Sequence, residues 1–315
     1  MGSEQPSEIK NSTSRIDRLW RLYGRTLALI LAMIVGALLP QAQAASAGLS
    51  YVLMGMLFFA FLDITITRES LHGSLLIILL ANITIPFLIY LFLLRIDPNI
   101  ALAGFITAIA PTATATPVIV RFLHGKVDYA ITSVLLTNVG IALLLPFILP
   151  WVAGPTVHIS TMDVLPSVLE VMFVPLGLAL VSRLLPTAAQ NILRRGKPLA
   201  FPLWLIVLFL VTSKASAFLW ENRSISAGLL LSIAAVSLVT CVLNFALGAW
   251  IGGRDFRREA SQALGQKNNS FTIWVALSYL TPLTALGPTC YVVYHNLYNG
   301  YQLYAQERSV EHPSS

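Results

Sequence analysis

Long apolar blocks separated by short polar segments run through almost the whole of this 315-residue chain. A helix needs roughly 20 apolar residues to cross the hydrocarbon core of a membrane, and most of the blocks have about this length. Their residues do not alternate with period two, as the strands of a membrane barrel would. We therefore predict an all-α polytopic membrane protein with ten transmembrane helices. The ten blocks cover residues 24–40, 47–66, 74–94, 99–125, 128–152, 162–186, 200–220, 225–252, 257–280 and 282–304.

The composition agrees with this pattern, because 56% of the residues are hydrophobic and only 11% are charged. Soluble domains carry about 25% charged residues. The net charge of +6 lies mostly in the short loops, so we expect contact with the lipid bilayer and no nucleic-acid partner. A phosphate-binding glycine loop is absent from the sequence, so we expect no nucleotide. Cys241 and Cys290 lie in apolar blocks, which favours core packing over a disulfide or a metal site. We expect no metal and no cofactor.

The positions of Lys and Arg predict the orientation of the chain in the membrane. Residues 1–22 and 306–315 are polar tails, and nearly all basic residues of the tails and loops fall on the same side as these tails. The exceptions are Arg95 and Arg223 on the opposite side, and Lys214 and Lys267 inside apolar blocks. Because cytoplasmic loops are enriched in Lys and Arg, we predict that both termini are cytoplasmic. The compact loops and short tails favour a bacterial inner membrane.

The fourth block contains a polar, proline-framed stretch close to its centre. Pro111 and Pro117 lie six residues apart. Each proline removes a backbone donor and clashes with the preceding turn of a helix, and each disfavours helical geometry in the residue before it. We therefore predict an interrupted helix here. Three hydroxyl groups lie between the prolines, on Thr112, Thr114 and Thr116.

The ninth block carries a second polar stretch, ALGQKNNSF, at about the same depth. Gly265 weakens the helix at this point, so we predict a second interruption. The polar side chains that follow it are Gln266, Lys267, Asn268 and Asn269.

The two interruptions occupy equivalent places in two sets of five blocks, which cover 23–153 and 160–305. Each interrupted block is the fourth of its set, and because five is odd the second set must insert upside down relative to the first. Inverted repeats with broken helices that meet at the midplane are typical of secondary transporters. Asn82 and Asn244, both in apolar surroundings, are a weaker echo between the two sets. The alternative is that Pro and Thr only kink a packed bundle.

The layout resembles the bile acid:sodium symporter family, which has ten helices in two inverted five-helix repeats. In that family a fourth helix with Pro-Gly-Gly-Thr-Ala-Ser-Asn crosses a ninth helix with Glu-Val-Gly-Met-Gln-Asn-Ser. The present chain has Pro-Thr-Ala-Thr-Ala-Thr-Pro from Pro111 and Ala-Leu-Gly-Gln-Lys-Asn-Asn from Ala263. The continuation RFLHGKVDYAITSVLLTN, with Gly125, and the second block LSYVLMGMLFFAFLDITI also resemble the family. The resemblance implies transport of an organic anion by alternating access.

The resemblance also implies where sodium would bind, and there the present chain differs. The family binds sodium through the Glu and Gln of the ninth helix and the Ser-Asn pair of the fourth. The matching positions here hold Ala263, Lys267, Thr116 and Pro117. A carboxylate has been lost and an ammonium group gained. We therefore expect transport that is not sodium-coupled in the family's usual way; the alternative is a sodium-coupled symporter with rearranged ligands.

Lys267 is the residue whose role matters most for this prediction. A charged Lys at the bilayer centre costs at least a few kcal/mol, and the sequence offers no acidic residue at its depth. Lys267 could replace sodium as a fixed positive charge, bind the carboxylate of an anionic substrate, or titrate and couple transport to protons. We favour the first two roles together. It could instead donate to the free carbonyls of the fourth block and only stabilise the crossing.

Other polar residues of the two interruptions could contribute ligands. Each threonine could instead bond to its own preceding turn, and Asn138 in the fifth block could form a helix–helix hydrogen bond. The candidate substrate- or ion-binding residues are Thr112, Thr114, Thr116, Asn138, Gln266, Lys267, Asn268 and Asn269.

Two further charged residues lie at matching depth nearer the opposite side of the membrane. Glu170 in the sixth block and Lys214 in the seventh are predicted to form a structural ion pair. Lys214 could instead extend its ammonium group to the membrane interface.

The sequence therefore predicts a secondary transporter of a small organic anion and not an enzyme. An intramembrane hydrolase would need paired aspartates, a zinc motif or a Ser/Lys or Ser/His pair. The spacing of Lys267 and Ser270 alone permits a Ser/Lys pair. A membrane sensor without transport activity is the other alternative, and it would require an output domain for which neither tail is long enough.

Overall fold

The computed structural model describes residues 15–62, 72–154 and 159–311. Within these residues the chain is helical and contains no strand, apart from one isolated β-bridge. Residues 1–14 and 312–315 of the predicted tails lie outside the described residues. The α-helices are α1 (Arg15–Leu38), α2 (Leu49–Phe61), α3 (Gly73–Leu93), α4 (Pro98–Ile109), α5 (Thr116–Phe122), α6 (Val127–Ala153), α7 (Thr161–Val181), α8 (Thr187–Arg195), α9 (Ala200–Glu221), α10 (Ala227–Gly252), α11 (Arg257–Gly265), α12 (Asn269–Tyr279) and α13 (Pro282–Glu311). Short 3-10 helices are η1 (Pro40–Gly48), η3 (Ser182–Leu184) and η4 (Lys197–Leu199).

The helices are long and apolar enough for an integral membrane protein, which confirms the predicted all-α membrane class. Among the described residues, six helical stretches have the length and composition of membrane spans, and two shorter apolar helices cover Thr26–Leu38 and Pro98–Ile109. Large apolar side chains such as Leu88, Leu178 and Leu231 are exposed on the outside of these helices. Contact with lipid is favourable for such an apolar surface, whereas contact with water would be unfavourable. The six stretches are Pro40–Phe61, Gly73–Leu93, Val127–Ala153, Thr161–Leu184, Thr187–Glu221 and Ala227–Gly252.

Within the described residues, each of the ten predicted blocks contains one helix or two consecutive helices; residues 63–66 of the second block lie outside the described residues. The fourth block is divided into α4 and α5, and the ninth is divided into α11 and α12; we call these pairs the fourth and the ninth segment. Helix α1 already begins at Arg15 and α13 continues to Glu311, so both extend into the predicted tails. Helix α8 lies where the sequence predicted only a polar connection. It was not predicted because its polar residues follow one face of a short helix and form no apolar block.

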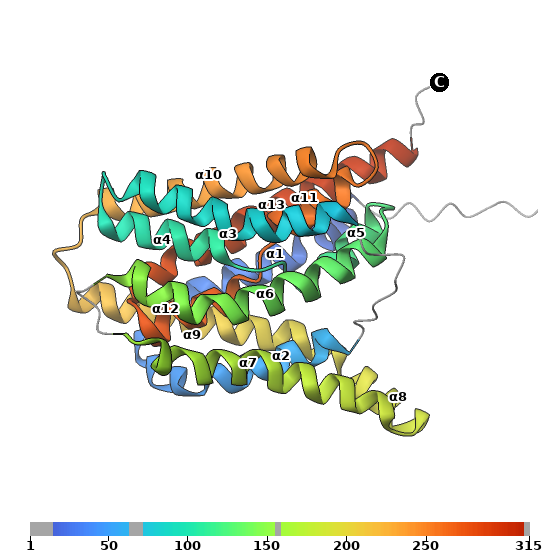
Figure 1. Cartoon of the computed structure of the whole chain (residues 1–315), viewed down its shortest axis with the longest axis horizontal. Coiled ribbons are helices and arrows are strands. Elements are labelled where there is room, and N and C mark those ends of the chain that lie inside the picture. Colours follow the sequence, from blue (N-terminus) through green and yellow to red (C-terminus); the bar gives the residue numbers. More distant parts are fainter. Residues whose placement is uncertain (1–14, 63–71, 155–158, 312–315) are drawn as a thin grey trace, which may run out of the picture.

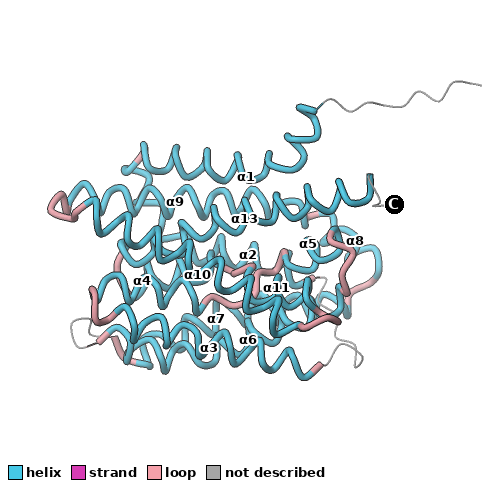
Figure 2. Tube along the Cα trace, turned by 90° about the horizontal axis from the view of Figure 1, so that it is seen from above, coloured by secondary structure: helices cyan, strands magenta, loops and turns pink. Residues whose placement is uncertain are grey.

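The helices are arranged in two groups that lie against each other. Helix α9 packs on α1 and α2, and α2 packs on α7. The other group contains α3, the two interrupted segments, α6, α10 and α13, with α10 in contact with both α11 and α13. Figure 1 shows α2, α7 and α9 along the lower side and α3, α4 and α10 along the upper side. Figure 2, the view from above, shows α1 at one edge beside α9 and loop segments inside the bundle as well as at its ends.

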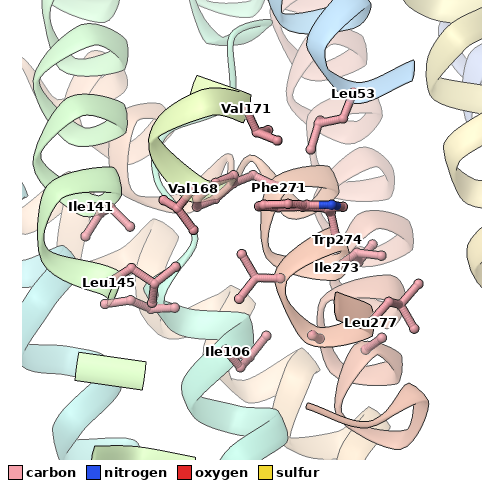
Figure 3. Close-up of a cluster of buried hydrophobic side chains, with 14 of the residues drawn as sticks. Leu53, Ile106, Ile141, Leu145, Val168, Val171, Phe271, Ile273, Trp274 and Leu277 are labelled. Carbon is pink, nitrogen blue, oxygen red and sulfur yellow. The ribbon is translucent and has the colours of Figure 1, made fainter. Parts of the chain in front are cut away.

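Helix α12 fills the space where the two groups meet. Figure 3 shows its side chains Phe271, Ile273, Trp274 and Leu277 among apolar residues of four other helices. In a membrane, such packing holds helices together by van der Waals contact, since lipid is as apolar as the side chains. The surrounding residues are Leu53 of α2, Ile106 of α4, Ile141 and Leu145 of α6, and Val168 and Val171 of α7.

Helix α11 lies unusually close to α10. A Cβ atom on Gly248 would collide with the backbone of Ala260, and one on Gly252 would lie 2.8 Å from the Ala260 Cβ. Small residues allow two membrane helices to approach each other's backbones in this way. Every residue from Glu259 to Leu277 is buried, so this stretch of the ninth segment is shielded from lipid by protein.

Candidate functional site

The interruption in the fourth segment lies between its two prolines. Helix α4 ends at Ile109, and Ala110 has the extended conformation expected of a residue before proline (φ −53°, ψ 132°). Pro111 therefore stands directly after the end of α4. Pro117 is the second residue of α5, where a missing N–H costs nothing because the first turn of a helix has no acceptor for it. One proline thus ends the first half-helix and the other begins the second.

The interruption in the ninth segment begins at a glycine. Helix α11 ends at Gly265, Gln266 is extended (φ −88°, ψ 101°), and α12 begins at Asn269. The ring of Phe245 lies directly against Gly265, so that a Cβ atom there would collide with it. Gly265 is therefore required by the close approach of an aromatic ring.

The two interruptions pair with each other through their backbones. Thr112 and Lys267 form an antiparallel β-bridge. Ala113 N donates to Gln266 O at 2.8 Å, and Asn268 N donates to Pro111 O at 2.7 Å. Each non-helical stretch thus satisfies backbone groups that the other has lost, which is what irregular backbone inside a membrane requires. In Figure 1, α4 and α12 lie toward the left and α5 and α11 toward the right, so the two segments run in opposite directions past this pairing.

Helix α6 supports the fourth segment with two polar side chains. Thr137 Oγ1 accepts a hydrogen bond from Thr112 N at 3.0 Å. Asn138 Nδ2 donates to Thr112 O at 2.8 Å, while its Oδ1 accepts from Asn268 Nδ2 at 3.2 Å. Asn138 therefore connects the two interruptions. A further bond joins them directly, from Thr112 Oγ1 to Ala263 O at 2.6 Å.

Helix α13 supports the ninth segment in the same manner. Tyr291 Oη donates to Gly265 O at 2.7 Å and accepts from Asn244 Nδ2 at 3.3 Å. His295 Nδ1 lies 3.3 Å from Asn269 Nδ2. Both side chains are buried. The carboxyl end of α11 and the amino end of α12 are thus both held by α13.

Lys267 places an ammonium group inside this arrangement. Its side chain is only 2% exposed, and Nζ donates a hydrogen bond to Asn82 Oδ1 of α3. Asn82 is itself oriented by donating from Nδ2 to Ile78 O at 3.1 Å. Among the described residues, no carboxylate forms an ion pair with Lys267. The carboxyl ends of α4 and α11 lie directly before Thr112 and Lys267 in the chain, and such helix ends favour a nearby cation.

Three buried oxygen atoms of the two interruptions have no hydrogen-bond partner within the described residues. They are Oγ1 of Thr116, Oε1 of Gln266 and Oδ1 of Asn269. Orphaned buried acceptors are rare in proteins and call for a donor, a water molecule or a cation. No cluster of His, Cys, Asp and Glu in the described ranges suits a metal ion. Neutral oxygen atoms of this kind instead suit a hard cation such as sodium or a water molecule.

The structure brings most of the predicted site residues together. Thr112, Asn138, Lys267, Asn268 and Asn269 belong to one hydrogen-bonded network. Gln266 takes part through its backbone, and Thr116 is buried beside the interruption. Thr114 is half-buried and has no hydrogen bond within the described residues.

Sequence reasoning missed three supporting residues, Thr137, Tyr291 and His295. All three lie in the helix that follows an interrupted segment. Polar residues at that place in otherwise apolar blocks were the available signal. Asn82 was noted as an echo of Asn244, but its contact with Lys267 was not foreseen.

Glu170 and Lys214 do not meet as predicted. Both line a cavity of about 590 Å³ between the two helix groups, but no ion pair joins them within the described residues. Lys214 Nζ instead donates to Leu277 O at 3.2 Å. Leu277 lies in the last turn of α12, where carbonyl groups lack an intrahelical partner, and a lysine can satisfy one of them. Sequence depth did not reveal this competing acceptor.

Comparison with known proteins found no family model and no curated protein that matches this chain.

Proposed function

We propose that this protein is a secondary transporter of a small organic anion that works by alternating access. In this proposal the chain forms two inverted sets of five membrane segments, and Lys267 supplies a fixed positive charge where the bile acid:sodium symporters, which the layout resembles, hold sodium. The observation that carries the proposal is the buried pairing of two interrupted segments around Lys267. Interrupted helices that meet inside a bundle are characteristic of transporter binding sites.

The supports of the two interruptions favour the inverted repeat. Each interrupted segment is held by the helix that follows it, α6 in the first set and α13 in the second. Asn82 of α3 and Asn244 of α10 lie in the helices that precede the two interrupted segments, and both contact the network. Moreover, α1 begins and α13 ends at the same end of the bundle (Figures 1 and 2), as an even number of crossings requires. Because the Lys and Arg of the loops gather on the side of the tails, we propose that this end of the bundle is cytoplasmic and that the membrane is a bacterial inner membrane.

The surroundings of Lys267 support the role of a fixed charge more than direct contact with substrate. Its ammonium group is buried, donates a hydrogen bond to the Asn82 amide oxygen and does not line the cavity between the helix groups. An intramembrane charge persists only where it has partners, and it usually marks a functional site. The bond from Nζ goes to Asn82 and not to Ser270, which argues against a Ser/Lys hydrolase.

The cavity between the helix groups is the place we assign to the anion. Its volume of about 590 Å³ is within the range of small-molecule sites, and its wall carries the ammonium group of Lys214 together with the carboxylate of Glu170. Trp274 and Leu277 of α12 form part of the same wall. Helix α12 therefore connects the two places: its amino end follows Lys267, and its last turn lies at the cavity. A movement of one helix group against the other would change the access to the cavity and leave the pairing of the interruptions intact.

A sodium-coupled transporter with rearranged ligands is the second candidate, and one observation favours it. The unpartnered oxygens of Thr116, Gln266 and Asn269 lie in the two interruptions and could receive a cation. The two candidates differ in whether the driving force includes sodium.

Flux measurements in liposomes test the proposal. Carboxylates, sulfonates and bile acids would first be screened for stabilisation of the purified protein, and the stabilising compound would be used as the radiolabelled probe. We expect uptake at the same rate in sodium and in choline buffer. Uptake that requires sodium would select the second candidate, and a protein that carries none of the stabilising anions would refute both.

The variant Lys267→Met isolates the fixed charge. Its side chain has similar length and fills the same space without a charge, so we expect a folded protein whose anion uptake falls at least 100-fold. Lys267→Gln combined with Ala263→Glu introduces the carboxylate and the amide that the bile acid:sodium symporters carry at the matching positions, and we expect it to regain uptake only in sodium. Wild-type uptake by Lys267→Met would remove the ammonium group from the mechanism.

A further inference from the structure

A groove of about 880 Å³ lies on the outer surface of the bundle, between α10, α11 and α13. It is separate from the cavity that we assign to the anion, which is lined by α2, α7, α9, α12 and η1. Along α10 its wall is apolar and includes Leu238 and Val242, both of which are exposed. At one end the lining changes to Arg254, Arg257 and Arg258.

The three arginines give this end of the groove a concentrated positive charge. Arg258 Nη1 donates to Leu123 O at 2.7 Å, so this residue is partly engaged in fastening α11 to the turn after α5. Arg254 and Arg257 are exposed, and neither has an ion pair within the described residues. Asp255 is the exposed acidic neighbour in the chain, which leaves an excess of positive charge. Arginine binds phosphate groups in a bidentate manner and suits this position better than a single point charge would.

The length of the groove matches one leaflet of a membrane. Gly252 is the last residue of α10, and Leu238 lies 14 positions before it. This spacing corresponds to about 21 Å along a helix, and one leaflet including its headgroups is also about 21 Å thick. The groove therefore extends from the end of a membrane span, where headgroups lie, into the region of the acyl chains. Trp250 and Tyr298 line its wall, and aromatic residues of this kind prefer the level of the headgroups.

We propose that this groove binds an anionic phospholipid. The phosphate group lies between Arg254 and Arg257, and one acyl chain follows the apolar wall formed by α10 and α13. Basic pockets between membrane helices are recognised binding sites for anionic headgroups. The inference does not depend on which substrate is transported, or on whether the protein transports at all.

Such a lipid would act on the segment that carries Lys267. Arg257 and Arg258 are the first residues of α11, and Glu259 Oε1 accepts from Lys126 N at 2.6 Å, next to the bond from Arg258 to Leu123. The bound lipid therefore stabilises the end of α11 and its attachment to the connection between α5 and α6. We expect the gain to appear as thermal stability of the whole protein.

The test uses the full-length protein, purified in a neutral detergent and stripped of lipid. Phosphatidylglycerol and phosphatidylcholine with identical acyl chains are added separately, and bound lipid is counted by native mass spectrometry while the unfolding temperature is measured. We expect one retained phosphatidylglycerol and a higher unfolding temperature, with at least ten-fold weaker retention of phosphatidylcholine. Equal retention of both lipids, or none of either, would overturn the proposal.

Two variants locate the lipid in the groove. Arg254→Gln with Arg257→Gln should weaken phosphatidylglycerol binding about 30-fold, since each basic residue near an anionic headgroup contributes a factor of about five to six in affinity. Arg194→Gln with Arg195→Gln removes two exposed arginines from α8 and should leave the binding unchanged. If both double variants lose the lipid equally, the attraction is general and no site exists.

The apolar part of the groove is tested by Val242→Trp, which fills it with a large side chain. We expect this variant to lose phosphatidylglycerol but to keep the unfolding temperature of the lipid-free wild type. Glycerol 3-phosphate alone should not compete, because it lacks an acyl chain. Full competition by glycerol 3-phosphate would instead indicate a site for free phosphate esters, and a change in oligomeric state of the arginine variant would indicate a second copy of the chain; either result contradicts the proposal.

Discussion

The interruptions in the fourth and ninth segments lie side by side, but they are formed by different means. In the fourth segment, prolines end one half-helix and begin the other, and hydroxyl groups are the only polar side-chain groups between them. In the ninth, the break follows Gly265 and contains an ammonium group that depends on Asn82 of another helix. The fourth interruption is therefore specified locally by its own covalent chemistry. The ninth is specified by its neighbours, and it is the one that concentrates charge.

The largest effect should come from removing the partner of that charge. In Asn82→Leu the Lys267 ammonium group keeps its buried position but loses its side-chain acceptor. Leaving a buried charge unpaired costs about 4 kcal/mol, and we expect this loss in the free energy of unfolding in mixed micelles. The double variant Asn82→Leu with Lys267→Met removes both partners and should recover most of the loss. If the double variant is as unstable as Asn82→Leu, the charge is not the cause.

A smaller loss should follow from removing the side chain that connects the two interruptions. Asn138→Ala leaves Thr112 O and Asn268 Nδ2 without the partner that the amide provides. We expect a loss of about 3 kcal/mol in the same unfolding measurement. Asn296→Ala is the control, because the Asn296 amide donates to Val292 O of its own helix. Equal losses in the two variants would show that the connection between the segments is energetically unimportant.

The ninth interruption should also be sensitive to one methyl group. In Gly265→Ala the added Cβ meets the ring of Phe245, and the two helices must move apart. Overpacking of this kind costs about 2 kcal/mol. Gly177→Ala in α7 places its Cβ where no atom lies within 4 Å, so its unfolding free energy should stay the same or rise. An equally stable Gly265→Ala protein would contradict the close packing of α10 against α11.

The same contrast explains what could be predicted from the sequence. Apolar blocks of spanning length predicted the long apolar helices, though not α8, because lipid imposes length and internal hydrogen bonding on each crossing. Pro111 and Pro117 marked the fourth interruption through local sterics alone. The contact from Lys267 to Asn82 joins residues 185 positions apart, and no local pattern encodes such a contact.

The failed pairing of Glu170 with Lys214 has the same physical origin. Sequence depth placed both residues at one level, and the structure brings both to one cavity. The preferred acceptor of Lys214 is a backbone carbonyl at the end of α12, and every residue carries such a group. Side-chain chemistry read from the sequence cannot reveal which free carbonyl lies nearest. The sequence pattern therefore predicts where helices lie better than it predicts which side chain contacts which backbone group.

The smallest effect should separate two threonines of the fourth interruption. Thr112 Oγ1 donates to Ala263 O at 2.6 Å, and this carbonyl lies in the last turn of α11, where it has no intrahelical donor. Thr112→Val keeps the shape, so we expect a loss of about 1 kcal/mol in the free energy of unfolding. Thr114 is half-buried without a hydrogen bond in the described part of the chain, and Thr114→Val should change stability by less than about 0.5 kcal/mol. If Thr114→Val leaves stability intact but abolishes anion uptake, the Thr114 hydroxyl belongs to the transport path. If both stability and uptake are unchanged, only Thr112 of this pair holds the two interruptions together.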